Sequence, residues 1–287
     1  MSTQITTAFV QQYHAEVTHL VQQMESKLAQ NCRQETQHSK SSYFDQIGAR
    51  TATEMTGRHS ATVLVDTPHS RRRVTLTDYV DTDGIDDEDK LRILIEPENN
   101  YAKAQAMAMK RAKDDAVITA ALGTAYTGEA GGTSTTFPST QQIASGSTGM
   151  TLAKMISMLE KFNGNKVETD EERFLVIGEK QVSDLLKLTE VNSADFNNVK
   201  VLTTGKPVSY LGFTIIMSTR LATNGSSERR CFAWVKPGIL FSMAKDITVD
   251  IGRRRDLNGM IQVQTKGSWG VTRMQEEQVV ECPCAES

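Results

Sequence analysis

The side chains that most often carry chemistry occur here in patterns that fit no common catalytic site. All five histidines lie in the first quarter of the chain: His14, His19, His38, His59 and His69. His14 and His19 are five residues apart on a predicted helix, so they do not share a face as a metal-binding pair requires. The Gly-x-Ser-x-Gly and His-Glu-x-x-His motifs of common hydrolases are absent. We therefore predict that the protein is not an enzyme and has no catalytic residues.

Metal and cofactor sites are also disfavoured by spacing. The four cysteines lack the paired two-residue spacing of a zinc ribbon: Cys32, Cys231, Cys282 and Cys284. We expect reduced thiols, the last two on a frayed tail. The acidic run at 81–89 lacks the third ligand and the bidentate glutamate of a calcium loop, and the glycines at 128–132 lack the Lys-Ser/Thr pair of a phosphate loop. We predict no metal and no cofactor.

Two runs of three arginines are candidates for binding a partner: Arg71, Arg72 and Arg73, and Arg253, Arg254 and Arg255. An acidic stretch between them contains Asp81, Asp83, Asp86 and Asp87. One interpretation of each arginine run is a solvated strand end. The alternative is that the arginines contact these acids on a neighbouring subunit, which would fix the register of the contact more than its affinity.

The first element predicted from the pattern is an amphipathic helix at residues 7–30. Apolar side chains recur there at three- and four-residue steps, and the main stripe contains Phe9, Tyr13, Val17, Leu20 and Met24. The following residues, 31–42, are polar and offer this stripe no local partner. We therefore expect the stripe to dock on another part of an assembly.

The rest of the chain predicts a mixed α+β fold. Strands at 44–56 and 73–80 would form a long polar hairpin, and a helix at 87–95 would end before Pro97. An Ala- and Met-rich stretch at 100–124 is the strongest helical signal, and a Gly/Ser/Thr-rich loop follows at 127–149. Further helices are predicted at 151–162 and 181–188, strands at 173–178, 210–218, 231–235, 239–243 and 247–251, and a last strand pair at 261–272 and 278–282.

Composition limits the class of protein. The chain has 287 residues, of which 38% are hydrophobic and 23% charged, so it can bury a core and is not disordered. The net charge of −3 gives no basic field for sequence-specific DNA binding. No signal peptide or membrane span is apparent, so we expect the protein to be cytoplasmic when made and to have no membrane partner.

The order of these parts resembles the HK97-like major capsid proteins of tailed bacteriophages. Short stretches are also similar to one phage capsid family: residues 43–48 (YFDQIG), 66–69 (DTPH), 112–115 (AKDD), 193–197 (SADFN) and 230–234 (RCFAW). Each stretch alone is weak, and the specificity comes from their joint order along nearly the whole chain. The resemblance implies a structural subunit that self-assembles into the icosahedral head enclosing the double-stranded DNA genome.

The resemblance also implies an HK97-like division of the chain into five segments. These are an N-terminal arm (1–42), an E-loop hairpin (43–85), a peripheral domain with a long spine helix (86–150), an axial domain (151–255) and return strands of the peripheral domain (256–287). An encapsulin-type compartment shell protein has the same fold, but the similar short stretches favour the phage capsid. A phage tail tube protein also has polar hairpins, but the long helix argues against it.

The implied location is the virion, assembled in the bacterial host cytoplasm, and the implied partners follow from that. They are further copies of the chain as hexamers and pentamers, the portal protein, and packaged DNA contacted without sequence specificity. Residues 41–89 contain no lysine, so covalent E-loop crosslinking through a lysine is not expected. No room precedes the arm for a long fused scaffold, so separate scaffolding and decoration proteins are compatible with this chain.

Overall fold

The structure, a computed structural model, describes residues 22–55, 57–58, 61, 64–86, 98–187, 209–257 and 259–286. The chain divides into two compact units, each built from segments that are distant in sequence. Unit 1 comprises Met1–Glu25, Tyr79–Arg111 and Ile247–Gly267, and unit 2 comprises Ser26–Asp78, Ala112–Asp246 and Ser268–Ser287.

Unit 1 contains the first part of the long helix α2 (Glu98–Leu122) and parts of strands β4 (Thr77–Ile85), β11 (Ile239–Arg253) and β12 (Ile261–Arg273). Its core is formed by Ile85, Ile261 and Val263, with Ala102 packed against them. Gln105 of α2 is also buried; it donates to the carbonyl of Val263 (3.1 Å) and accepts from the hydroxyl of Thr265 (2.9 Å). Because buried amides need partners, these bonds attach α2 to β12 at a defined position.

Unit 2 is built around a five-stranded sheet in the order β13-β10-β7-β9-β8. Its strands are β7 (Arg173–Ile177), β8 (Ser209–Tyr210), β9 (Phe213–Met217), β10 (Glu228–Val235) and β13 (Val279–Ala285). β7 is buried throughout, and it pairs antiparallel with β10 and parallel with β9. The unit also contains α3 (Leu152–Gly164) and α4 (Glu179–Lys187). Thr151 caps α3 by accepting from the amide of Lys154 (3.3 Å), as its position before the apolar stripe predicts.

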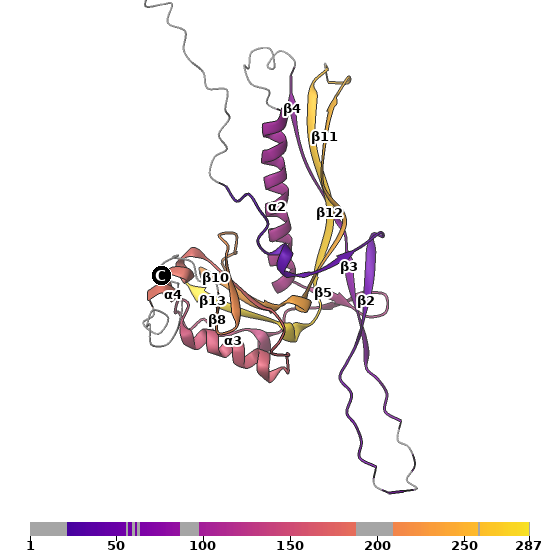
Figure 1. Cartoon of the computed structure of the whole chain (residues 1–287), viewed down its shortest axis with the longest axis vertical. Helices are drawn as coiled ribbons and strands as arrows, with labels where there is room; N and C mark the ends of the chain where they lie inside the picture. Colours follow the sequence, from indigo (N-terminus) through magenta and orange to yellow (C-terminus); the bar gives the residue numbers. More distant parts are fainter. Residues whose placement is uncertain are drawn as a thin grey trace, which may run out of the picture. The chain divides into compact units, whose positions relative to one another are not determined.

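A second sheet in unit 2 has the order β2-β3-β5-β6. Its strands are β2 (Ser41–Ile47), β3 (His69–Thr75), β5 (Ala125–Thr127) and β6 (Thr133–Thr135). Residues 48–68 join β2 to β3, and the described residues 48–55 and 64–68 extend away from the sheet without strand structure (Figure 1). The antiparallel hairpin predicted from the sequence is confirmed in β2 and β3, but the predicted strand bounds were wrong. Residues 48–55, predicted as strand, are not strand, and the strand predicted at 73–80 is divided between β3 and β4.

The remaining elements are short. β1 (Arg33–Thr36) pairs parallel with residues 240–243 of β11. It is therefore the first strand of a four-stranded sheet with the order β1-β11-β12-β4. Single 3-10 turns occur at η2 (Ala29–Asn31), η3 (Ser139–Gln141), η4 (Lys236–Gly238) and η5 (Glu276–Gln278). The α+β class and the predicted helices at 100–124, 151–162 and 181–188 are confirmed in α2, α3 and α4.

Several strand predictions were wrong in detail. The strands predicted at 239–243 and 247–251 are one strand, β11, because pairing with neighbouring strands carries the extended backbone through the polar residues between them. The last strands do not pair with each other, since β12 lies between β11 and β4 whereas β13 pairs with β10. Cys282 and Cys284 are not on a frayed tail but are buried in β13. The predicted loop at 127–149 contributes β6 and η3.

The N-terminal helix prediction is partly wrong. Residues 7–21 lie outside the described part of the chain, but residues 22–28 are described and are not helical. The backbone amides of Lys27 and Leu28 bind the carboxylate of Asp114 instead of continuing a helix. The helix predicted at 87–95 also lies outside the described residues.

Candidate interaction surface

The described residues offer no cluster for metal chemistry. No group of three or more His, Cys, Asp or Glu among them could hold a metal ion, and His38 and His69 are exposed. None of the described helices is long and apolar enough to cross a membrane. The residues singled out from the sequence as possible contacts lie on the surfaces described next.

The arginine run on β3 is divided between the two faces of its sheet. Side chains alternate along a strand, so Arg71 and Arg73 share one face while Arg72 lies on the other. The structure follows this rule: Arg71 and Arg73 are partly exposed, and Arg72 is buried. Their adjacency in sequence suggested one cluster of three, although the two-residue period of a strand predicts the division.

Arg73 lies in a row of cations and aromatic rings that crosses three strands. It is paired in register with Tyr43 on β2 and with Tyr126 on β5. Its guanidinium lies 4.6 Å from the centre of the Tyr126 ring, and that of Arg71 lies 5.8 Å from the Tyr43 ring. Tyr43 is 45% and Tyr126 is 42% exposed. Tyrosine and arginine are enriched where proteins bind one another, so this face suits a protein partner.

Arg71 also forms a two-armed ion pair with Asp45, the residue opposite it on β2. The Nε to Oδ1 distance is 2.5 Å and the Nη2 to Oδ2 distance is 3.2 Å. The hydrogen bond from Arg71 lowers the pKa of the Asp45 carboxyl, and the hydrogen bond to Asp45 raises the pKa of Arg71. Both groups are therefore charged at neutral pH, and the pair orients Arg71 on the exposed face.

Arg72 instead holds two parts of unit 2 together. Its Nε donates to the carbonyl of Met274 (2.8 Å), and its Nη2 forms an ion pair with Glu276 (2.5 Å). The exposed fractions of the Arg72 and Glu276 side chains are 8% and 16%. Arg72 is thus a buried residue that joins β3 to the segment after β12, whereas Arg71 and Arg73 are partly exposed.

The second arginine run and the acidic stretch lie in unit 1. Arg253, Arg254 and Arg255 are exposed at the end of β11, and Arg254 donates to Asp256 (Nε to Oδ1, 2.8 Å) and to Gln262 (3.0 Å). The hydrogen bond from Arg254 lowers the pKa of Asp256 to about 2. Of the predicted acids, Asp83 and Asp86 are exposed, Asp81 is half-buried, and Asp87 lies outside the described residues.

Asp114 is a buried acid whose structural role the sequence pattern did not predict. It is completely buried on α2, and its carboxylate accepts from the Ser26 hydroxyl (2.6 Å) and from the amides of Lys27 (3.0 Å) and Leu28 (3.0 Å). This acid clamps the chain as it enters unit 2. Its position could have been noticed in the sequence, because aspartate has a low helix propensity and is unexpected inside an Ala- and Met-rich helix.

The predicted docking stripe is mostly beyond the described residues. Phe9, Tyr13, Val17 and Leu20 lie outside them, whereas Met24 is described and is 54% exposed. Nearby, Glu25 forms an ion pair with Lys110 of α2 (2.6 Å), and the side chain of Gln22 accepts from Arg111 (2.7 Å). That Met24 belongs to a docking surface remains a prediction.

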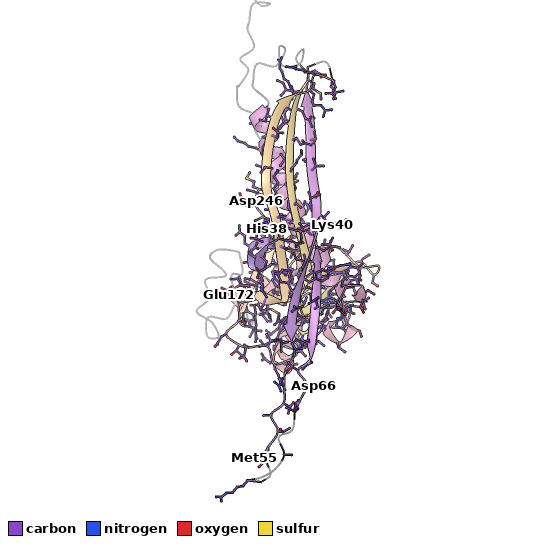
Figure 2. The ribbon with its side chains drawn as sticks, turned by 90° about the vertical axis from the view of Figure 1, so that its right-hand side faces the viewer. His38, Lys40, Met55, Asp66, Glu172 and Asp246 are labelled. Carbon is purple, nitrogen blue, oxygen red and sulfur yellow. The ribbon has the colours of Figure 1, made fainter. Side chains whose placement is uncertain are left out.

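The loop between β2 and β3 exposes apolar side chains. Met55 is 74% exposed and Leu64 is 91% exposed, and Ile47 at the end of β2 is 69% exposed. Met55 and Asp66 lie on the part of the loop that projects from the hairpin (Figure 2). These side chains are not buried by the described residues of their own chain, so they are available to a partner.

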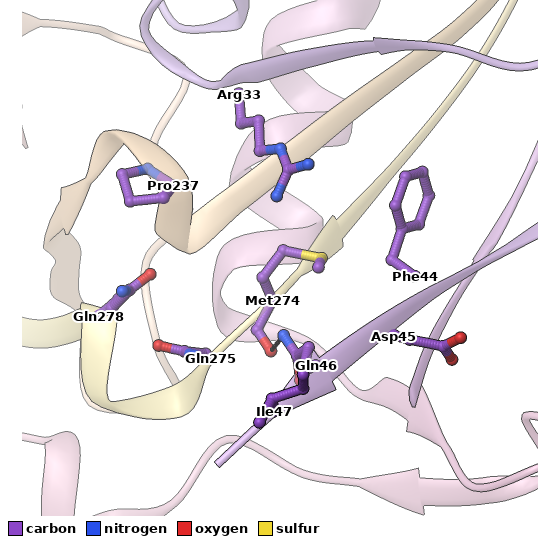
Figure 3. Close-up of a pocket in the computed structure, with 9 residues that line it drawn as sticks. All are labelled: Arg33, Phe44, Asp45, Gln46, Ile47, Pro237, Met274, Gln275 and Gln278. Carbon is purple, nitrogen blue, oxygen red and sulfur yellow. Dashed lines mark hydrogen bonds between the residues drawn. The ribbon is translucent and has the colours of Figure 1, made fainter. Parts of the chain in front are cut away.

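A cavity of about 220 Å³ lies at the base of the hairpin in unit 2 (Figure 3). Its lining mixes apolar and polar side chains: Arg33, Phe44, Asp45, Gln46, Ile47, Pro237, Met274, Gln275 and Gln278. Gln46 donates to the carbonyl of Met274 (3.0 Å), which joins β2 to the chain segment after β12. Nothing in this lining combines a nucleophile with a base, so the cavity does not indicate catalysis.

The sequence matches a family model described as phage capsid protein over residues 5–286. No curated protein matches the sequence.

Solved structures show the same fold at low sequence identity. The capsid of cyanophage P-SCSP1u has a TM-score of 0.72 at 15% identity, covering 100% of this chain and 96% of that chain. A chain of Mycobacterium phage Che8 has a TM-score of 0.72 at 14% identity, covering 96% and 97%. The cyanophage Pam1 capsid has a TM-score of 0.73 at 13% identity, covering 97% of each chain. The predicted HK97-like fold is thereby confirmed.

Proposed function

The chain belongs to the phage capsid protein family, and we propose on this basis that it acts as the major capsid protein, the subunit from which the phage head is built. The observation that carries this function is the family match over residues 5–286, together with a shared fold that extends over nearly all of each matched capsid chain. The protein is a structural component of the virion. Its role is mechanical and needs no catalytic residues.

The long loop between β2 and β3 would serve as the arm that reaches a neighbouring subunit. Its exposed Met55 and Leu64 would lose contact with water only when another molecule covers them. Many such modest contacts, repeated in every subunit, supply the free energy of a closed shell. The segments proposed from the family are the N-terminal arm (1–42), E-loop (43–85), peripheral domain (86–150 and 256–287) and axial domain (151–255).

Charged residues would set the register of these contacts. We propose that Arg71 and Arg73, on the exposed face of β3, and the run at 253–255 meet acids of neighbouring subunits such as Asp83 and Asp86. All of these charged side chains are exposed or partly exposed, so a neighbouring subunit could reach them. Exposed charges at the rim of an interface change association rate and specificity more than affinity.

The proposed partners beyond the chain itself are the portal protein, packaged double-stranded DNA contacted without sequence specificity, and separate scaffolding and decoration proteins. Assembly into hexamers and pentamers in the host cytoplasm is part of the same proposal. The lack of lysine at 41–89 supports a shell held by non-covalent contacts at this loop.

Negative-stain electron microscopy of the purified full chain tests the function, with and without a candidate scaffolding protein from the same source. Closed shells of uniform diameter are the expected result. Tubes would instead indicate a tail protein, and small oligomers under every condition would contradict the shell function. Shells that contain a cargo protein when made from the chain alone would indicate a compartment rather than a phage head.

A further inference from the structure

Three of the four cysteines lie together on one face of the five-stranded sheet. Cys231 on β10 is directly opposite Cys282 on β13 in the antiparallel register, and Cys284 is two residues further along β13. Directly opposite residues share a face, as do residues two apart on one strand. All three side chains have no exposed surface, and all three thiols are free.

A buried lysine from α3 faces this cluster. The Lys154 side chain is 6% exposed, and its Nζ lies 3.9 Å from the sulfur of Cys284. It also donates to the carbonyls of Thr148 (2.8 Å), Gly149 (3.0 Å) and Pro283 (3.1 Å). These carbonyls carry no net charge, so the sulfur of Cys284 is the group within hydrogen-bond reach that can carry a compensating negative charge as a thiolate.

The electrostatics of the three thiols differ accordingly. Hydrogen bonds from the thiols of Cys231 and Cys282, together with the charge of Lys154, lower the pKa of Cys284. The hydrogen bond to Cys284 and burial raise the pKa of Cys231, and the same two causes raise that of Cys282. Cys32 provides a contrast, because burial and the nearby carboxylate of Asp114 raise its pKa.

We propose that Cys231 and Cys282 are an oxidisable pair that forms a disulfide between β10 and β13, with Cys284 as the thiolate that starts the reaction and Lys154 as its counter-charge. Opposite residues of an antiparallel pair have Cα atoms about 4.5–5.5 Å apart, which is within the range that a disulfide spans. The bond would join the outer strand of the sheet covalently to its neighbour. The oxidant is a small disulfide such as oxidised glutathione.

The reaction balances in three exchange steps. The Cys284 thiolate attacks the small disulfide, forms a mixed disulfide and releases one small thiolate. Cys231, after losing its proton to that thiolate, attacks the sulfur of Cys284 and releases the second small thiolate. Cys282 then loses its proton to the second thiolate and attacks the sulfur of Cys231, and the thiolate of Cys284 leaves. The net result is one protein disulfide and two small thiols, and Cys284 is regenerated beside Lys154.

Access to the cluster requires local opening of the sheet. β13 is the last strand in the sheet order, and its outer edge carries single backbone bonds to a non-strand segment: Ile143 donates to Glu281 (2.9 Å) and Ala285 donates to Thr148 (2.9 Å). Pro283, which has no amide proton to donate to a ladder, lies between Cys282 and Cys284. Outer strands open at lower free energy than central ones. A reducing cytoplasm would keep the thiols free, and the disulfide would form once the protein meets an oxidising medium.

The test is incubation of the folded, unassembled full chain with oxidised glutathione, followed by alkylation of free thiols and peptide mass spectrometry. We expect a crosslink between Cys231 and Cys282, with Cys32 remaining free as an internal control for global unfolding. Cys284→Ser should slow the oxidation about tenfold or more. Cys282→Ser should stop the exchange one step earlier and accumulate the disulfide between Cys231 and Cys284.

Lys154→Gln distinguishes an electrostatic role from a structural one. It should slow formation of the mixed disulfide at Cys284 while the reaction of Cys32 in the same sample keeps its rate. The proposal is overturned if Cys284→Ser oxidises as fast as the parent chain, if no crosslink forms, or if Cys32 reacts as fast as the cluster. These outcomes concern the unassembled chain, so they are independent of whether shells form.

Discussion

Asp114 shows how one buried carboxylate determines where a chain changes its structure. It accepts hydrogen bonds from Ser26, Lys27 and Leu28, and it is completely buried. The sequence pattern predicts a helix up to residue 30, but amides that bind this carboxylate cannot also bind carbonyls of a preceding turn. A long-range polar contact therefore overrides a local apolar period, and the period alone could not reveal it.

Asp114→Ala should lower the free energy of unfolding by about 3 kcal/mol, because it leaves buried donors without an acceptor. Urea denaturation measures the loss, and faster hydrogen exchange at the amides of Lys27 and Leu28 would locate it. Asp115→Ala is the matched control. Asp115 is the next residue on α2 and forms a partly exposed ion pair with Arg220, so its loss should cost less than about 1 kcal/mol. Equal losses for the two variants would contradict the clamp.

The ion pair of Arg254 and Asp256 predicts a pH dependence. The pKa of Asp256 is lowered to about 2 by the hydrogen bond from Arg254. Any stability that this pair contributes is therefore complete above the ordinary pKa of aspartate, about 3.9, and is lost as the pH falls toward 2. NMR titration of the Asp256 carboxyl should give a value near 2 in the parent chain and a value near 4 in Arg254→Gln. An unchanged value in the variant would contradict the pairing.

At the scale of elements, β3 places neighbouring arginines on opposite faces of the sheet, with Arg72 buried and Arg71 partly exposed. Arg72→Met should lower the free energy of unfolding by about 3 kcal/mol, because it removes the nearly buried ion pair with Glu276 and the hydrogen bond to the Met274 carbonyl and leaves Glu276 only the longer contact with Arg273 (3.5 Å). Arg71→Met removes an exposed pair that water screens, so it should change the free energy of unfolding much less than Arg72→Met does. Chemical denaturation of both variants checks the difference. If Arg71→Met proves the more destabilising, the assignment of the two faces is wrong.

The elements also show what the sequence could and could not predict. α2 and α3 were predictable because a strong helix former or a capping threonine signals them locally. The partner of β13 was not, since the pattern of a strand says which residues alternate but not which strand lies beside it. Cys282 and Cys284 were placed on a frayed tail for this reason, although their register with β10 buries them. The same limit applies to the candidate surface: the arginines at 71–73 were singled out from the sequence, but their tyrosine neighbours on β2 and β5 come from strand pairing.

At the scale of the whole molecule, the fold is shared with capsid chains whose sequences are very different from this one. The capsid chains compared here share 13% to 15% of residues with this chain yet have TM-scores of 0.72 to 0.73. Burial patterns and element order tolerate replacement of most residues as long as volume and polarity are kept. Surfaces between subunits have no such freedom within one shell, because each must match another copy of the same chain.

Assembly should therefore depend on loop residues that folding does not need. A double variant, Met55→Asp with Leu64→Asp, should keep a free energy of unfolding within about 0.5 kcal/mol of the parent, because both original side chains are exposed. The same variant should fail to form closed shells in electron microscopy. Thr51→Asp, also on this loop, adds charge without removing an apolar side chain and should assemble. Normal shells from the double variant would show that the loop makes no essential contact.

The alternation on β3 also acts as a check on correct folding. A shift of the β2–β3 register by one residue would turn Arg72 outward and bury Arg71 and Arg73, so the interior ion pair and the surface row would be lost together. A hairpin with the wrong register could not keep the exposed row of Arg71 and Arg73 while losing the buried ion pair of Arg72. Subunits with that error would be both less stable and unable to associate, and a growing shell would exclude them without a separate proofreading factor.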